Sequence, residues 1–341
     1  MKNRIHHGLL RNRFFRAHHD LETPSFISDS MNDSFRHEPV LAAEVIEFLR
    51  PASGRTIVDG TLGGGGHSSL PLEGGARVIG FDRDPEALVH ARQQLARHGE
   101  MFTAVEGNFR NAPAALAAQG ITEVDGILLD LGVSSHQLDT PGRGFSFQRV
   151  GPLDMRMGKD GATAADLVNT LPAAELARIF REYGDEPRAI HFAARIVRAR
   201  EIKPLVTTAE LAELIAGGRQ GPRHPATRVF QALRIAVNNE LGSLEEALPA
   251  LSLILSPGGR MGIITFHSLE DRMVKQFFRH HSTAEIDNPA WPAPRPNPDC
   301  LFKLLTPRSI TASPAELASN PRSRSARLRV VERLPQTGGA Q

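Results

Sequence analysis

The segment best suited to chemistry is a glycine-rich stretch, DGTLGGGGHS, at residues 59–68. Four consecutive glycines follow a short β-branched run, and glycine lets the backbone approach a bound ligand closely. The third glycine of a G-x-G-x-x-G fingerprint would fall on Ser68 or Ser69, and the sequence has no G-x-x-x-x-G-K phosphate loop. This spacing disfavours NAD and ATP. It leaves a nucleoside ligand without pyrophosphate, such as S-adenosylmethionine, with a glycine-rich surface turn as the alternative.

Two acidic residues stand at the ends of other β-like runs. Asp82 ends residues 77–82, where a carboxylate accepts hydrogen bonds from ribose hydroxyls. Asp130 ends residues 126–130, where it either orients an amino group that is being methylated or contacts the cofactor. Methyl transfer to nitrogen needs mainly alignment of the lone pair, so positioning supplies most of the acceleration. We expect Asp130 to orient the nucleophile.

Other titratable residues follow Asp130 in a predicted loop. His136 has a side chain that titrates near neutrality, but a lone histidine in a loop is more often a surface residue than a catalyst. Ser134 and Ser135 have no paired base visible in the sequence, which disfavours a nucleophilic serine. The role of His136 stays open.

A sheet is needed to bring these residues together. Short β-like runs at residues 56–59, 77–82, 102–106 and 126–130 alternate with helical stretches, beginning with a helix at 40–49. Such alternation predicts a doubly wound, Rossmann-like α/β sheet with parallel strands. A fifth strand is expected at 260–266, and runs at 300–305 and 327–333 are expected to close the sheet as an antiparallel pair. Ser268 with Asp271 three residues on predicts a capped helix at 269–279.

The interval between the fourth and fifth strands has a helical period throughout. We expect it to be an inserted all-helical domain that recognises the substrate. Its predicted helices are 164–169, 173–183, 187–200, 208–216 and 227–241. The expected organisation is a disordered extension or misassigned start (1–30), the core in two parts (31–139 and 245–335), the insertion between them (140–244) and a disordered tail (336–341).

Composition excludes several classes of protein. The 341 residues include one cysteine, Cys300, so no internal disulfide is expected, and no Cys and His cluster has zinc spacing, so no metal site is expected. No apolar run is long enough for a membrane span, and we expect a cytoplasmic protein. For residues 1–30 an organelle transit peptide is the alternative to a start at Met31, although acidic residues there disfavour it.

With these stretches in view, the chain resembles the MraW/RsmH family of methyltransferases over about residues 37–334. The resemblance implies a class I S-adenosylmethionine-dependent methyltransferase core with an inserted helical domain. It implies methylation of the N4 amino group of a cytosine in the decoding region of 16S rRNA, in the small ribosomal subunit. The motifs that carry it include HEPVL (37–41), DGTLGGGGHS (59–68), FDRDPEAL (81–88), GNFR (107–110), DLGVSS (130–135), HPATRVFQALRIAVNNEL (224–241) and TFHSLEDRMVKQFF (265–278). The implied cofactor contacts are Gly65, Gly66, His67, Asp82, Phe109, Asp130 and Gln137.

Two departures from the family pattern stand out. Only residues 68–76 separate the glycine loop from the second strand, and Pro71, Gly74 and Gly75 lie among them. Proline and glycine are poor helix formers, so we expect the intervening helix to be a single turn. The family usually has a longer helix in this interval. The shorter helix expected here motivates the alternative function, a non-catalytic rRNA-binding assembly factor that keeps the fold. The second departure is His136, where the family more commonly has proline.

Arginine clusters and two aromatic residues are the candidate RNA contacts. Arginine suits phosphate, and an aromatic ring can stack on an extruded base. A solvated basic face and core packing are the respective alternatives. The candidates are Arg143, Phe145, Phe147, Arg223, Arg228, Arg322 and Arg324. The expected partner is 16S rRNA in the small subunit, and the oligomeric state, including a homodimer, stays open.

Overall fold

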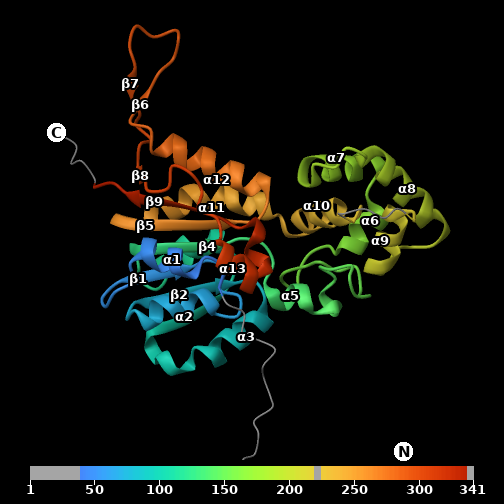
Figure 1. Cartoon of the computed structure of the whole chain (residues 1–341), viewed down its shortest axis with the longest axis horizontal. Helices are drawn as coiled ribbons and strands as arrows, with labels where there is room; N and C mark the ends of the chain where they lie inside the picture. Colours follow the sequence, from blue (N-terminus) through green and yellow to red (C-terminus); the bar gives the residue numbers. More distant parts are fainter. Residues whose placement is uncertain (1–38, 219–223, 336–341) are drawn as a thin grey trace, which may run out of the picture. The chain divides into compact units, whose positions relative to one another are not determined.

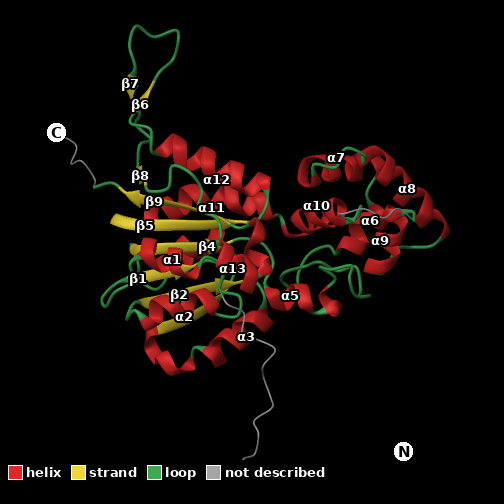
Figure 2. Cartoon of the chain, in the orientation of Figure 1, coloured by secondary structure: helices red, strands yellow, loops and turns green. Residues whose placement is uncertain are grey.

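The computed structural model describes residues 39–218 and 224–335. Its main feature is a seven-stranded sheet with strand order β3-β2-β1-β4-β5-β9-β8 (Figure 1 and Figure 2). The first five strands pair in parallel, and β9 runs antiparallel to both β5 and β8. This mostly parallel order confirms the predicted doubly wound, Rossmann-like α/β sheet. The strands are β1 (Thr56–Asp59), β2 (Arg77–Asp82), β3 (Phe102–Glu106), β4 (Val124–Asp130), β5 (Leu255–Thr265), β8 (Phe302–Leu304) and β9 (Arg327–Arg333).

The sheet is buried on both faces. Neighbouring residues of β1 show this, because Ile57 packs into one hydrophobic cluster and Val58 into another. The Ile57 cluster includes α1 (Ala42–Leu49), and the Val58 cluster includes α4 (Ala112–Ala117), α11 (Glu240–Ile254) and α12 (Ser268–His281). Parallel strands covered on both faces are apolar almost throughout, which explains their continuous β-branched runs.

The helix after the glycine loop is longer than the sequence predicted. It is α2 (Gly66–Glu73), with eight residues, so the expected single turn is wrong. The helix begins inside the glycine loop, and Pro71 costs it only one backbone hydrogen bond because proline lacks an N–H. His67, Ser68 and Leu72 are buried, so tertiary packing holds a helix that intrinsic propensity disfavours.

The segment between β4 and β5 contains no strand within its described residues. Five of its helices have a hydrophobic core of their own, which includes Phe180, Phe192 and Leu233. These helices are α6 (Ala164–Thr170), α7 (Ala173–Gly184), α8 (Ala189–Ile202), α9 (Thr208–Ala216) and α10 (Thr227–Asn238). The preceding short elements are α5 (Ser135–Asp139) and the 3-10 turn η3 (Pro141–Arg143).

The chain returns to the sheet at Asn239. This residue has a left-handed conformation with φ of 48°, which ends α10 before the predicted residue 241. The next helix, α11, packs against the sheet through Leu244, Leu248 and Leu251. The predicted boundary after residue 244 therefore falls within α11.

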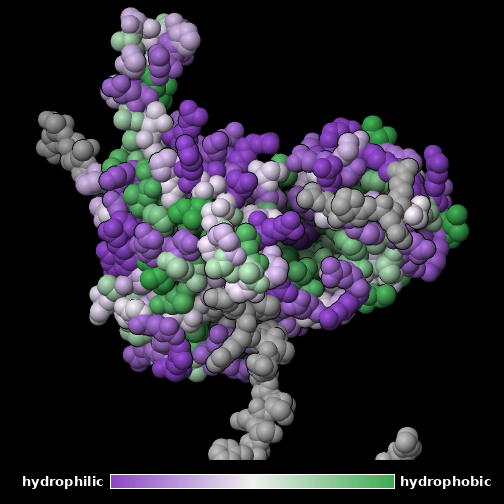
Figure 3. Space-filling model, viewed as in Figure 1, coloured by the Kyte–Doolittle hydropathy of each residue, from purple (hydrophilic) through white to green (hydrophobic). Residues whose placement is uncertain are grey.

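Helix α12 follows β5, and its cap differs from the expected pair. The capping residue is His267, and Glu270 completes the capping box in place of Ser268 and Asp271. Figure 3 shows strongly hydrophilic residues over α12, whose exposed residues include Arg272, Lys275 and Arg279. The remaining elements are α3 (Pro85–Gln94), η1 (Ala96–Met101), η2 (Phe109–Asn111), β6 (Glu285–Ile286), β7 (Arg295–Pro296), α13 (Pro314–Ser319) and η4 (Pro321–Ser325).

The termini are not part of the described structure. Both segments predicted to be disordered, 1–30 and 336–341, lie outside it. Among the described residues, no helix is long and apolar enough to cross a membrane.

Candidate functional site

The glycine loop is fixed to β2 by Asp82. The backbone N–H of Gly63 donates to Asp82 Oδ2 at 2.7 Å, and the N–H of Asp84 donates to Oδ1 at 2.8 Å. Gly65 has φ of 88°, and a Cβ there would lie 2.9 Å from Leu95 Cδ1. The left-handed backbone conformation therefore favours glycine at position 65, and a Cβ there would also force the Leu95 side chain to shift.

The carboxylate of Asp82 is suited to a ligand that donates hydrogen bonds. Burial raises its pKa to about 6, although the two backbone N–H groups act in the opposite direction. Further donors would favour the ionised form, and ribose hydroxyls are such donors. Contact between Asp82 and a ribose stays a prediction that this environment supports.

Asp130 has one carboxylate oxygen engaged and one without a partner. His67 Nδ1 lies 3.4 Å from Asp130 Oδ2, and His67 Nε2 donates to the carbonyl oxygen of Val40 at 2.8 Å. Asp130 Oδ1 is buried and accepts no hydrogen bond from the described residues. A buried acceptor without a donor is costly, so Oδ1 fits a cofactor or substrate group that presents an N–H or O–H.

The same carboxylate titrates close to neutrality. Burial raises the pKa of Asp130 to about 6; His67 opposes the rise, and the charges of Asp59 and Glu270 add to it. Asp59 is itself buried and accepts hydrogen bonds from Ser68 Oγ at 2.7 Å and from the N–H of Thr61 at 3.1 Å. Burial raises the pKa of Asp59 as well. An acceptor with such a pKa is well matched to proton transfer near neutral pH.

Gln137 and Arg143 meet at Asp84. Gln137 Nε2 donates to Asp84 Oδ2 at 2.9 Å, and Arg143 Nη1 donates to the same oxygen at 2.5 Å. Arg143 Nη2 also donates to the carbonyl oxygens of Arg156 and Met157, each at 3.0 Å. Because this guanidinium is only 16% exposed and bonded on several sides, its position favours fastening the loops over the predicted RNA contact.

Two further residues lie near this edge of the sheet. Phe109 opens η2 after β3 and packs partly buried against the sheet, where a Cβ at Gly60 would lie 2.8 Å from Phe109 Cβ. His136 Nε2 lies 3.1 Å from Glu86 Oε2, and the Glu86 side chain is 60% exposed. That pairing supports a surface role for His136. Gly66, the remaining predicted cofactor contact, is the first residue of α2.

The aromatic RNA candidates pack within the helical segment. Phe145 is 8% exposed and belongs to the hydrophobic core of that segment. The ring centroid of Phe147 lies 4.6 Å from that of His224 and 4.9 Å from that of Phe230. These contacts favour core packing, the alternative that the sequence left open.

The arginine candidates differ in their surroundings. Arg322 forms a two-bond ion pair with Asp139, at 2.7 and 2.8 Å. Arg228 is half-buried at the start of α10. Arg324 is exposed and has no ion-pair partner within residues 39–218 and 224–335. Arg223 lies outside the described residues.

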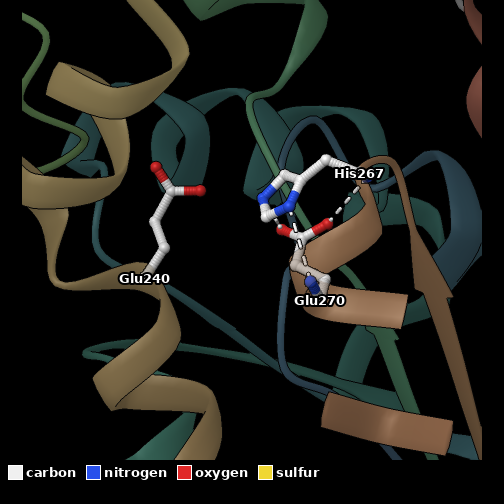
Figure 4. Close-up of side chains that lie close together, drawn as sticks. All are labelled: Glu240, His267 and Glu270. Atoms are coloured by element: carbon white, nitrogen blue, oxygen red, sulfur yellow. Dashed lines mark hydrogen bonds and ion pairs between the residues drawn. The ribbon is translucent and has the colours of Figure 1, made fainter. Parts of the chain in front are cut away.

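A polar cluster that the sequence did not reveal lies at the start of α12. It consists of Glu240, His267 and Glu270 (Figure 4). Arg234 forms an ion pair with Glu240. The available signal was the position of His267 just after β5, because polar residues after parallel strands gather at one edge of the sheet. Glu270 lies on α12 itself, but Arg234 and Glu240 come from α10 and α11, which no local pattern places there.

Comparisons with known proteins agree on one family. The model of the MraW methylase family matches residues 34–334. Proteins named "Ribosomal RNA small subunit methyltransferase H" are similar: that of Anaeromyxobacter sp. (strain K) is 54% identical over 309 residues, covering 89% of this chain and 100% of the relative. The protein of the same name from Geobacter sulfurreducens is 50% identical over 316 residues, covering 88% and 100%.

Likeness to solved structures is weaker. An rRNA methylase from Streptococcus thermophilus covers 86% of this chain and 94% of its own length, with a TM-score of 0.38 and 11% identity. Similarity at this level adds nothing to the functional argument.

Proposed function

This chain belongs to the MraW methylase family, and on that premise we propose that it methylates the ribosomal RNA of the small ribosomal subunit. S-adenosyl-L-methionine is its methyl donor. We propose further that the target is the N4 amino group of a cytosine in the decoding region of 16S rRNA, and that the reaction takes place in the cytoplasm. The names of relatives that this chain covers from end to end support the substrate.

The observation that carries the proposed chemistry is the unpartnered Oδ1 of Asp130. An exocyclic amino group offers two N–H donors, and a hydrogen bond from one of them to Oδ1 would fix the orientation of the nitrogen lone pair. The amino nitrogen gains the methyl group and loses one proton. We propose that the Asp130 carboxylate, whose pKa burial raises to about 6, accepts this proton as the nitrogen becomes acidic during methyl transfer.

The cofactor supplies an electrophilic methyl group bound to a sulfonium. We propose that Gly65, Gly66 and His67 hold it at the loop between β1 and α2 and that Asp82 accepts hydrogen bonds from its ribose. The contact between His67 and Asp130 ties this loop to the carboxylate proposed to orient the substrate. Phe109 and Gln137 complete the proposed set.

The target base must leave its stack to reach Asp130. Methylation of an exocyclic amino group therefore suits a single-stranded or loop region of RNA better than a duplex. We propose that the helical segment between β4 and β5 recognises that RNA. Arg324 is the candidate phosphate contact that its exposure best supports.

The glycine loop and the helix after it give no support to the alternative function, a non-catalytic rRNA-binding assembly factor. That alternative rested on a shortened first helix, whereas α2 has eight residues and its glycine loop is bonded to Asp82.

The test is methyl transfer from labelled S-adenosyl-L-methionine to unmodified small ribosomal subunits, with the RNA and protein fractions separated before counting. Label in the RNA of the small subunit is the expected result. Label only in protein, or none with a cofactor-binding enzyme, would refute the proposal.

A further inference from the structure

Three potential metal ligands converge beside the end of β5. Glu240, His267 and Glu270 each offer one ligand atom, and these atoms lie within 4.8 Å of one another. Figure 4 shows the Glu240 carboxylate facing the His267 ring from α11, with the Glu270 carboxylate beside the ring. Two helices that are separate in sequence therefore direct one nitrogen and two carboxylate groups at a common point.

The ring nitrogen His267 Nε2 is buried without a hydrogen bond. The His267 side chain is 9% exposed, and Nε2 has no hydrogen-bond partner among the described residues. Glu270 Oε1 lies 3.1 Å away but does not make a hydrogen bond with it. Apart from this contact with Glu270, no group among the described residues replaces the water that Nε2 loses on burial, which points to a ligand that completes the site.

The cluster carries an excess of negative charge. Arg234 Nε and Nη2 each donate to one oxygen of Glu240 at 2.9 Å, so one guanidinium faces two carboxylates. Each Glu240 oxygen keeps a further lone pair, so pairing with Arg234 leaves it able to bind a cation.

We propose that Glu240, His267 and Glu270 bind a divalent transition-metal cation. Mn²⁺ and Zn²⁺ are the ions that suit this set of ligands. Imidazole nitrogen with carboxylate oxygen suits these ions, whereas Mg²⁺ and Ca²⁺ prefer oxygen ligands alone. The sequence predicted no metal site because only cysteine and histidine spacing was informative there. These ligands come together only through the packing of α11 against α12.

Binding requires two small adjustments. Metal–ligand bonds of about 2.0–2.2 Å require the ligand atoms to draw closer than 4.8 Å. Ligation at Nε2 also moves the ring proton to Nδ1, so the long 3.4 Å hydrogen bond from the N–H of Glu270 to Nδ1 is given up. The bound cation would then join the start of α11 to the start of α12 and stabilise the folded chain.

The inference does not depend on the substrate, and metal binding alone tests it. We would titrate the chelator-treated full chain with Mn²⁺ by calorimetry and follow free Mn²⁺ by electron paramagnetic resonance. The native chain is expected to bind one Mn²⁺ and to melt at a higher temperature when loaded. His267→Asn and Glu270→Gln are expected to weaken binding at least tenfold and to abolish the melting shift.

These variants are chosen to preserve the fold. Asparagine is a favoured helix cap and keeps an acceptor at position 267, and glutamine keeps an acceptor for the N–H groups of Phe266 and His267. The matched control is His280→Ala, because His280 lies on the same helix, 3.1 Å from Asp299 Oδ2, but 50% exposed. It is expected to bind Mn²⁺ like the native chain.

Three results would overturn the proposal. They are a native chain that binds no Mn²⁺, binding that survives both His267→Asn and Glu270→Gln in folded protein, and equal loss of binding in His280→Ala. Any of them would assign Glu240, His267 and Glu270 to an ion-pair network between α11 and α12 that needs no metal.

Discussion

His67 Nδ1 lies 3.4 Å from Asp130 Oδ2, and this contact joins the first turn of α2 to the end of β4. The opposite ring nitrogen is held by the carbonyl oxygen of Val40 at 2.8 Å, so the imidazole has a fixed orientation. The loop proposed to hold the cofactor and the carboxylate proposed to orient the substrate are therefore parts of one buried polar network. We expect substitutions that affect the loop to lower mainly cofactor affinity, and substitution of Asp130 to lower mainly the rate of methyl transfer.

Replacing Asp130 tests its role in turnover. Asp130→Asn keeps the shape but weakens the acceptor, and we expect the single-turnover rate to fall by about 10² to 10⁴. Cofactor affinity, measured by calorimetry, is expected to change less than tenfold. Large loss of affinity with normal turnover at saturating cofactor would instead make Asp130 a cofactor contact.

Replacing Asp82 tests the position of the ribose. Asp82→Ala is expected to weaken cofactor binding by about 1–3 kcal/mol, because hydrogen bonds to a charged acceptor are lost. The control is Asp125→Ala, since Asp125 Oδ2 accepts from the N–H of Thr56 at 2.8 Å at the opposite end of the strands. Unchanged affinity in Asp82→Ala, measured by calorimetry, would place the ribose elsewhere.

Acid pH is expected to reduce turnover. The pKa of Asp130 is raised to about 6, so its acceptor form is lost as the pH falls through that value. Single-turnover rates at saturating cofactor should approach a tenfold loss per pH unit below about 6. The residual rate of Asp130→Asn should lack this dependence, and an identical acid limb in that variant would assign the titration to another group.

The glycine loop offers a matched pair of substitutions. Gly65→Ala places a Cβ 2.9 Å from Leu95 in a residue with φ of 88°, and we expect it to destabilise the chain by about 1–3 kcal/mol. Gly64→Ala meets only the ring of His90, at 3.2 Å, where a flexible side chain can move. Denaturant unfolding would compare them, and equal losses of stability would contradict this account of the turn.

Arg324 is the arginine to test for RNA binding. Arg324→Ala is expected to weaken binding of small-subunit RNA at low salt. It is also expected to reduce the slope of log affinity against log salt concentration by about one. Arg97→Ala is a suitable control, since Arg97 is exposed and paired with Glu73 at 2.7 Å. If both variants lower RNA affinity equally in filter binding, the loss comes from removing one positive charge and not from a specific contact at Arg324.

Sequence patterns predicted the strands well where local signals agreed. The bounds of β1, β2, β3 and β9 match because β-branched runs end at polar residues or turns. The start of β5 was missed because residues 256–259 resemble a turn, yet Leu255 pairs with Val124 across an irregularity in the register. Helix α2 was underestimated because burial of His67 and Leu72 outweighs the poor propensity of Pro71 and glycine.

Part of the candidate site could also be predicted from local sequence signals. Asp82 and Asp130 were found because residues at the carboxyl ends of parallel strands gather at one edge. The pairing of Arg143 with Asp84 and the cluster around His267 depend on how separate elements pack, so no spacing in the sequence revealed them.

The most direct test of the central claim is nucleoside analysis of small-subunit RNA after reaction with labelled S-adenosyl-L-methionine. The account predicts label in N4-methylcytidine for the native chain and at least a hundredfold less for Asp130→Asn. Label in any other nucleoside would contradict the assignment of the cytosine amino group.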